Sequence, residues 1–135
     1  MAVQEFDFAS GKVLDPKRKQ AILAVETDAD ADVIKEALRK ISYKMLGHES
    51  DIRAALELVR NHKVGVLFLD ADLPGIKVNE LLPSIKNAFS GFNIVVLSSS
   101  VTKEMLSEVL RLGAAGFLVK PVQADALDKV LAKLK

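Results

Sequence analysis

After residue 20, the chain alternates short apolar runs with longer segments in which apolar residues recur at helical spacing. The apolar runs cover residues 21–25, 43–46, 64–69, 93–97 and 116–119, and the second of them, YKML, is the weakest. Three of the runs are almost continuously apolar, which is typical of strands covered on both faces in a parallel sheet. The pattern therefore predicts five strands.

Four of the intervening segments carry a clear apolar stripe of helical period. We expect the first two helices to begin at Asp30 and Ser50, whose side chains are suited to cap a helix. Thr102 precedes the helix before the last strand, and Gly113 is expected to end it. The segment 78–89 contains Pro83, which lacks an interior hydrogen bond, so this helix is predicted to start late or to kink there. The stripes are formed by Val33, Ile34, Ala37, Leu38 and Ile41, by Ile52, Ala55, Leu56 and Val59, by Met105, Leu106, Val109 and Leu110, and by Leu127, Val130, Leu131 and Leu134.

The predicted order of elements is βαβαβαβαβα. Such alternation favours an α/β fold with a parallel sheet, helices on both faces and right-handed crossovers. Residues 1–19 fit no element of this pattern, and we expect them to form a poorly ordered N-terminal extension. The expected domain covers residues 20–135.

Length and charge exclude several classes of protein. The 135 residues are 50% hydrophobic, and 19 Lys and Arg against 18 Asp and Glu give a net charge of +1. This predicts one domain, with no reason to expect nucleic-acid binding or a cationic membrane surface. The absence of Cys excludes disulfides and thiolate sites, and no apolar run approaches the ~20 residues of a membrane span. We expect a cytoplasmic location.

Polar residues gather directly after the predicted strands. In an open α/β sheet, ligands bind outside the carboxyl ends of the strands. We therefore expect carboxylates from two strand ends, a hydroxyl from a third and an ammonium from a fourth to converge on one pocket. The residues in question are Glu26, Thr27 and Asp28, then Asp70 and Asp72, then Ser98, and finally Lys120.

These groups are suited to phosphoryl transfer with a divalent metal. Clustered carboxylates favour Mg²⁺, which takes only one or two side-chain oxygens and keeps several waters. A carboxylate can be the nucleophile toward phosphorus, and the charge that develops needs a metal, a cation and a hydrogen-bond donor around it. We assign Asp70 as the nucleophile, Lys120 as the cation and Ser98 as the donor.

Three strings of the sequence match one known family. LFLDADLPG places an Asp four residues before a Pro, VVLSS has a Ser followed by a small residue, and AAGFLVKP has a Gly-aromatic-x-x-Lys-Pro stretch. Over roughly residues 20–135, the chain resembles the receiver domain of bacterial two-component response regulators, such as the chemotaxis receiver. The resemblance implies a three-layer, doubly wound, flavodoxin-like fold whose five parallel strands have the order 2-1-3-4-5.

The same resemblance implies a set of site residues. By it, Asp70 accepts a phosphoryl group from a histidine kinase or phosphotransfer protein, and Ser98 and Lys120 contact the phosphoryl oxygens. Glu26 and Asp70 hold Mg²⁺, and Asp72 contributes its backbone carbonyl. The domain is then no enzyme beyond Mg²⁺-dependent self-phosphorylation and self-dephosphorylation.

The resemblance also implies a switch, made of Ser98 and Phe117, that changes a protein-binding face. We expect this face to be built by residues 101–113, Phe117 and the last helix. The expected output partner is a downstream protein or a C-terminal output domain outside this chain. The sequence also leaves a homodimer open. Neither direct nucleic-acid binding nor membrane binding is expected.

The sequence departs from the family beside Glu26. Where the family usually has two adjacent acidic residues, this chain has Glu26 and Thr27, so weaker metal binding is expected unless Asp28 or Asp72 supplies the missing charge. Val78 also stands where many members have Gly. These departures leave open a pseudo-receiver, a protein-interaction module that acts without phosphorylation.

Two other classes fit the strand-end residues less well. A phosphatase of the haloacid dehalogenase type shares the D-x-D, Ser and Lys order, but its further acidic pair is matched only by Asp125 and Asp128 inside the last helix. A flavin or nucleotide binder needs a phosphate loop after the first strand, where this chain is acidic.

Overall fold

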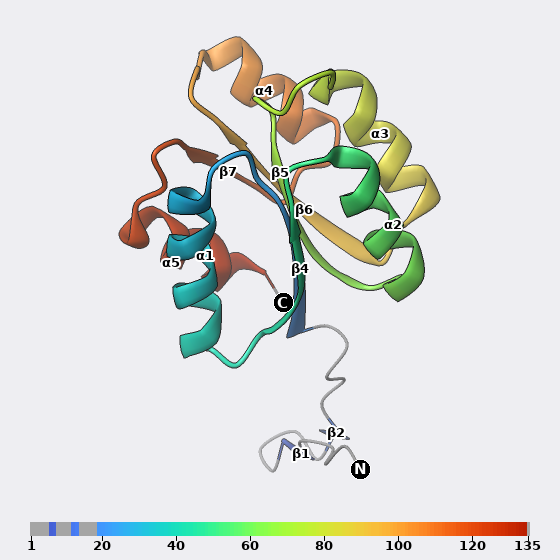
Figure 1. Ribbon diagram of the computed structural model, residues 1–135, viewed down its shortest axis with the longest axis vertical. Helices are drawn as coiled ribbons and strands as arrows, with labels where there is room; N and C mark the ends of the chain where they lie inside the picture. The colour runs from blue at the N-terminus through green and yellow to red at the C-terminus, as the bar shows by residue number, and fades with distance from the viewer. Residues whose placement is uncertain (1–5, 8–11, 14–18, 135) are drawn as a thin grey trace.

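The structure is a computed structural model that describes residues 6–7, 12–13 and 19–134. Its main sheet has five parallel strands in the order β4-β3-β5-β6-β7, which confirms the expected α/β class and the order 2-1-3-4-5 (Figure 1). The strands are β3 (Gln20–Ala24), β4 (Lys44–Glu49), β5 (Gly65–Asp70), β6 (Phe92–Ser98) and β7 (Gly116–Val119). The helices are α1 (Asp28–Lys40), α2 (Ile52–His62), α3 (Val78–Ala88), α4 (Lys103–Arg111) and α5 (Ala124–Lys133).

The helices cover both faces of the sheet, α1 and α5 on one face and α2, α3 and α4 on the other (Figure 1). Each face has its own apolar cluster. Because successive side chains of a strand point to opposite faces, a fully buried strand contributes to both clusters. β5 places Val66 and Phe68 against α1 and α5, and Leu67 and Leu69 against the other three helices. This explains why the central runs are almost continuously apolar.

The predicted starts of the first two helices are wrong. The N-cap of α1 is Thr27, three residues before the expected Asp30, and the N-cap of α2 is Asp51 rather than Ser50. In both cases the cap is the last residue with extended backbone, and its side chain accepts a hydrogen bond from a backbone N–H of the first turn. Where several residues in a row can cap a helix, the path of the backbone decides which of them becomes the N-cap.

The helix that contains Pro83 does not start late, because α3 begins at Val78. Proline removes one backbone donor, and burial of the neighbouring Leu82 and Ile85 holds the helix through that position. The predicted limits of α4 are confirmed, since Thr102 is its N-cap and Gly113 follows its end with a φ of 107°.

The weakest predicted strand is displaced toward the C-terminus, since β4 covers Lys44–Glu49 instead of residues 43–46. β4 is an edge strand that pairs only with β3, and the register shifts between Ala21 and Ile22. An edge strand needs fewer apolar residues, so the polar end of β4 gave no strand signal.

The N-terminal part contains a separate two-stranded sheet in which β1 (Phe6–Asp7) pairs antiparallel with β2 (Lys12–Val13). The expectation of poor order for residues 1–19 falls mainly outside the described residues, and it stays a prediction. Within the described part of the chain, no helix is long and apolar enough to cross a membrane.

Candidate functional site

Asp70 is the last residue of β5, and it lies at the carboxyl edge of the sheet without any exposed surface. Its Oδ1 accepts a hydrogen bond from the backbone N–H of Asp72 at 2.9 Å. Its Oδ2 accepts one from the backbone N–H of Glu26 at 3.0 Å and one from Lys120 Nζ at 2.9 Å. Three donors from three separate loops therefore hold this carboxylate in one orientation.

The Lys120 ammonium lies among three carboxylates from the ends of β3 and β5. Its Nζ is 2.9 Å from Asp70 Oδ2, 3.1 Å from Asp72 Oδ2 and 3.9 Å from Glu26 Oε2. Burial alone would lower the pKa of Lys120, but the hydrogen bonds to Asp70 and Asp72 outweigh burial and raise this pKa above its ordinary value. Lys120 therefore stays charged and neutralises part of the acidic cluster.

Asp72 links the loop after β5 to the loop after β6. Its Oδ2 accepts a hydrogen bond from the backbone N–H of Ser99 at 2.9 Å in addition to the one from Lys120. Burial raises the pKa of this carboxyl, but the bonds from Ser99 and Lys120 outweigh burial, so the pKa lies below its ordinary value. The sequence interpretation used only the backbone carbonyl of Asp72, whereas its side chain also belongs to the site.

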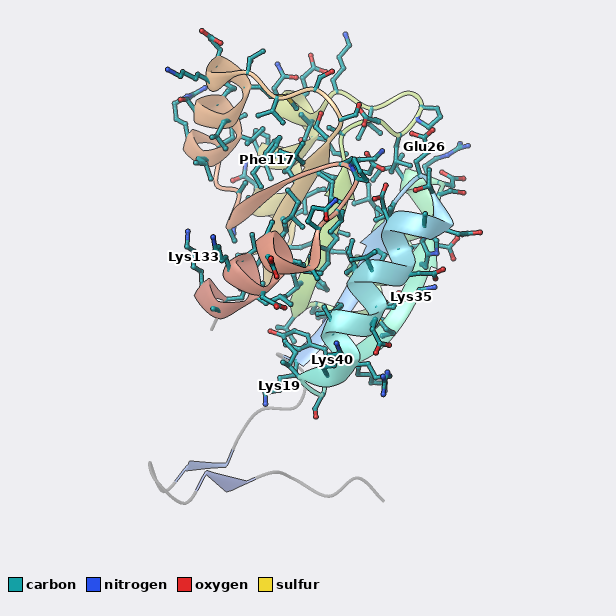
Figure 2. The ribbon with its side chains drawn as sticks, turned by 90° about the vertical axis from the view of Figure 1, so that its left-hand side faces the viewer. Lys19, Glu26, Lys35, Lys40, Phe117 and Lys133 are labelled. Atoms are coloured by element: carbon teal, nitrogen blue, oxygen red, sulfur yellow. The ribbon has the colours of Figure 1, made fainter. Side chains whose placement is uncertain are left out.

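The two predicted switch residues lie on β6 and β7, outside the hydrogen bonds of the acidic cluster. Ser98 is buried, and its hydroxyl donates to the Ser100 carbonyl at 2.9 Å, so it makes no bond to Asp70 in the described part of the chain. Phe117 is half-buried on β7 and packs against the apolar cluster of α2, α3 and α4. Figure 2 shows Phe117 on the side of the molecule that carries α4 and α5.

The acidic stretch after β3 divides between the cluster and the start of α1. Glu26 points to the edge of the sheet where α1 begins, as Figure 2 shows, while Lys40 marks the opposite end of that helix. Thr27 is occupied with capping α1, and the Asp28 side chain is 95% exposed and 4.0 Å from His48 Nδ1. The structure therefore brings Glu26 to Asp70, but it does not bring Thr27 or Asp28 there.

The donor set suits a weakly held Mg²⁺. No group of three or more His, Asp or Glu side chains among the described residues is arranged as a metal site. Mg²⁺ does not require one, because it commonly takes one or two carboxylates and keeps waters. The carboxylates of Glu26, Asp70 and Asp72 already converge on one cation, the Lys120 ammonium. These oxygen donors fit the ion.

Asp30 is a residue of the site region that the sequence interpretation missed. It was expected to cap the first helix, but it is buried at 7% exposure, and its carboxylate accepts a hydrogen bond from the backbone N–H of Val122, 92 residues away. The available signal was the capping-box spacing Thr27-x-x-Asp30, which marks a helix start but not a distant partner.

Comparisons with known proteins agree with one another. The model of a family described as the response regulator receiver domain matches residues 22–132. The transcriptional regulatory protein CitT of Bacillus subtilis (strain 168) is 32% identical over 69% of this chain and 41% of its own length, so the chain spans less than half of that relative. The two-component response regulator ORR6 of Oryza sativa subsp. japonica is 31% identical over 84% of this chain and 70% of its own length.

A solved structure resembles the chain to a similar degree. The isolated REC domain of RcsB from Salmonella enterica serovar Typhimurium, in the presence of the phosphomimetic BeF3⁻, has a TM-score of 0.73 and 27% identity. The match covers 84% of this chain and 85% of that one. It therefore extends over most of the chain rather than over a single motif.

Proposed function

Because this chain belongs to the response regulator receiver domain family of two-component systems, we propose that it accepts a phosphoryl group on Asp70. The observation that carries the proposal is the environment of Asp70, whose two oxygens are held by the N–H groups of Glu26 and Asp72 and by Lys120 Nζ. Such an arrangement aims one carboxylate at the carboxyl edge of the sheet and surrounds it with fixed donors. The proposed phosphodonor is a histidine kinase or a phosphotransfer protein.

In the proposed step, a carboxylate oxygen of Asp70 attacks the phosphorus atom of a phosphohistidine. An oxygen–phosphorus bond forms, giving an acyl phosphate, and the phosphorus–nitrogen bond breaks with its electron pair leaving on the imidazole nitrogen. Lys120 neutralises charge on the phosphoryl oxygens. Because the Asp70 side chain has no exposed surface, the loops around it must open before the donor can reach it.

Receiver domains generally bind Mg²⁺ at the phosphorylation site, and we propose the same here. Glu26, Asp70 and the backbone carbonyl of Asp72 would hold the ion. A divalent cation supplies positive charge beside the transferred phosphoryl group. Since the Thr27 hydroxyl caps α1, it adds no charge to this set, and we expect binding weaker than at a site with two adjacent carboxylates.

We propose that the switch acts on a surface made by α4, β7 and α5. Four of the large apolar side chains that are exposed in the described residues, Val101, Leu106, Leu110 and Val119, lie on α4, on β7 or directly before α4. Apolar side chains gathered in this way suit a protein partner. Ser98 ends the strand that leads to α4, and Phe117 belongs to β7. The proposed occupant is a downstream protein or an output domain, as is general for receiver domains.

The acceptor assignment is tested with acetyl phosphate and Mg²⁺, followed by intact mass spectrometry. We expect one added phosphoryl group on the parent protein, lost again in mild base, and none on Asp70→Asn. Asp28→Asn is the matched control, since Asp28 belongs to the same sheet edge but lies outside the cluster; it should keep the label. Label on Asp70→Asn would mean that another residue is the acceptor.

The competing pseudo-receiver has one observation in its favour, which is that Thr27 leaves the site one carboxylate short. A parent protein that takes up no phosphoryl group from a small donor with saturating Mg²⁺ would contradict our proposal and favour a phosphorylation-independent interaction module.

A further inference from the structure

Among the described residues, the buried carboxylate of Asp30 has no cationic partner, and both of its oxygens accept hydrogen bonds. Oδ2 accepts a hydrogen bond from the Thr27 hydroxyl at 3.0 Å, and Oδ1 accepts one from the backbone N–H of Val122 at 2.9 Å. The residue is 7% exposed. Burying a carboxylate is unfavourable unless its oxygens accept hydrogen bonds. The two bonds of Asp30 meet this need and join the start of α1 to the loop that contains Val122. A favourable interaction with the dipole of α1 would not require the bond to Val122.

Val122 follows Lys120 by two residues, in the loop between β7 and α5. The backbone N–H of Lys120 donates to the Ser98 carbonyl at 2.9 Å, which ties the start of this loop to β6. The N–H of Val122 donates to Asp30, which ties the end of the loop to α1. The Lys120 side chain therefore projects from a short segment that is anchored on both sides.

Thr27 completes the arrangement from the start of α1. Its Oγ1 accepts a hydrogen bond from the Asp30 backbone N–H at 3.4 Å and donates to the Asp30 carboxylate. A carboxylate at position 27 could cap the helix but could not donate this bond. Thr27, which replaces the second acidic residue of the usual pair, thus helps to hold the Asp30 carboxylate in its orientation.

We propose that Asp30 is a positioning residue that holds the loop after β7 so that the Lys120 ammonium stays on Asp70. Among the described residues, Asp30 forms no hydrogen bond or ion pair with Asp70 or Lys120, and it acts through the backbone of Val122. The expected effect of Asp30 on phosphorylation rests on the proposed function, whereas its expected effect on the position of the Lys120 side chain does not.

A purely local role would limit Asp30 to the first turn of α1. Under that reading, replacing Asp30 weakens the helix start and leaves Lys120 unchanged. The bond to Val122 argues against it, because it joins residues 92 positions apart and is fully buried. The two readings differ in what they predict for the Lys120 amine.

The test compares Asp30→Ala, Asp30→Asn and Asp32→Ala in the full chain. Asp32 is the matched control, because it is an exposed carboxylate two residues after Asp30 on the same helix. Asn at position 30 keeps an oxygen for the Val122 N–H, so it should restore most of the parent behaviour and stays informative if Asp30→Ala folds poorly. The first readout is the rate at which an acylating reagent modifies Lys120, relative to the exposed Lys103 of the same molecule.

We expect Lys120 to be acylated at least fivefold faster in Asp30→Ala than in the parent, with amide exchange at Val122 at least tenfold faster. Asp30→Asn and Asp32→Ala should stay within twofold of the parent. Labelling by acetyl phosphate should slow several-fold in Asp30→Ala at saturating Mg²⁺, with Mg²⁺ affinity unchanged. Equal Lys120 reactivity in the parent and in a folded Asp30→Ala would overturn the inference. If the parent takes no label, the proposed function fails while the Lys120 measurement still decides the role of Asp30.

Discussion

The side chains at the carboxyl edge form an acidic group whose charge Lys120 neutralises only in part. Asp70, Asp72 and Glu26 face the single ammonium of Lys120, and backbone N–H groups donate to both oxygens of Asp70 and to Oδ2 of Asp72. A second charge-bearing contact, from Asp30 to Val122, steadies the loop that carries the ammonium. Single substitutions can therefore test the contribution of each of these side chains in turn.

Asp72→Asn should lower the free energy of unfolding at pH 7 by about 1 kcal/mol, since it removes a partly exposed ion pair with Lys120. The pKa of Asp72 is lowered in the folded state, so its stabilising effect is full above the ordinary value of 3.8 and is lost as pH falls through the folded pKa. The pKa of Lys120 is raised, so its effect is full below the ordinary value of 10.5 and is lost only as pH rises through the folded pKa. Urea denaturation of both proteins between pH 3 and pH 7 should therefore show a difference that shrinks toward acid.

The control for this pH dependence is Asp128→Asn, which changes an exposed carboxylate on α5 that is not a member of the cluster. It should follow the parent at every pH. A difference between Asp72→Asn and the parent that persists unchanged at pH 3 would contradict the assigned ion pair.

Thr27→Asp should tighten Mg²⁺ binding by about tenfold, because it adds a carboxylate on the residue next to Glu26. One unit charge at a few ångströms is worth on the order of 1–4 kcal/mol before a longer distance and desolvation are subtracted. The same change should destabilise the metal-free protein, since a carboxylate at position 27 loses the bond donated to Asp30 and repels it. A Mg²⁺ titration at fixed ionic strength, followed by amide shifts around Asp70, measures the affinity.

Thr27→Ser serves as the control, because serine keeps both the cap and the donated hydrogen bond. Its Mg²⁺ affinity and stability should match those of the parent. Equal affinities of Thr27→Asp and the parent would mean that Asp28 or the Asp72 side chain already supplies the missing charge.

At the residue scale, the strand-end rule identified Asp70 and Lys120 as neighbours although they lie 50 positions apart. The strand-end rule did not identify Asp30, because an acidic residue near a helix start normally lies in solvent and complements the helix dipole. Nothing in the local sequence distinguishes such a residue from a buried one. The bond from the Thr27 hydroxyl to Asp30 was not predicted either, because the two side chains meet only once α1 has formed.

At the scale of elements, α4 and β7 link the site to the exposed apolar side chains. The N-cap of α4 is Thr102, four residues after Ser98, and the helix buries Val109 while exposing Leu106 and Leu110. A displacement of Ser98 toward the site would pull on this short connection, and such a switch biases two existing states.

Addition of beryllofluoride as a phosphoryl analogue, with Mg²⁺, should shift backbone amide resonances mainly in residues 101–113, at Phe117 and in α5. The expected cause is movement of the loop after β6, which Asp72 now holds through Ser99. Spectra of Asp70→Asn under the same conditions provide the control and should not change. Shifts confined to α2 would show that the output surface lies on another face.

Element limits were predictable where a single strong signal occurred, as with Thr102 and Gly113 around α4. They were less predictable where signals compete, as with Ser50 and Asp51, which are both good caps. Pro83 illustrates a third case, in which tertiary burial of its neighbours overrides a local helix-breaking tendency.

At the scale of the whole molecule, the two apolar clusters share one set of strands and should not unfold separately. Leu23 and Leu67 are fully buried on neighbouring strands but face opposite sides of the sheet. Leu23→Ala and Leu67→Ala should each lower the free energy of unfolding by about 2–5 kcal/mol. Both should retain a single cooperative transition, measured by fluorescence-independent probes such as circular dichroism and amide exchange.

Two separate transitions in either variant would mean that the faces of the sheet form independent units. The alternation of apolar runs and helical stripes was enough to predict one parallel α/β domain, because the central runs are buried by helices on both faces of the sheet. The strand order came from the resemblance of three short strings, since periodicity does not reveal which strands are neighbours.

The most direct measurement of the central claim locates the phosphoryl group chemically. After treatment with acetyl phosphate and Mg²⁺, borohydride reduces an aspartyl phosphate to homoserine, which peptide mass spectrometry identifies by position. Our account predicts homoserine at position 70 of the parent and no homoserine in Asp70→Asn. Homoserine at position 72 or 28, or a reduced glutamate elsewhere, with position 70 unmodified, would mean that another carboxylate is the acceptor and would contradict our account.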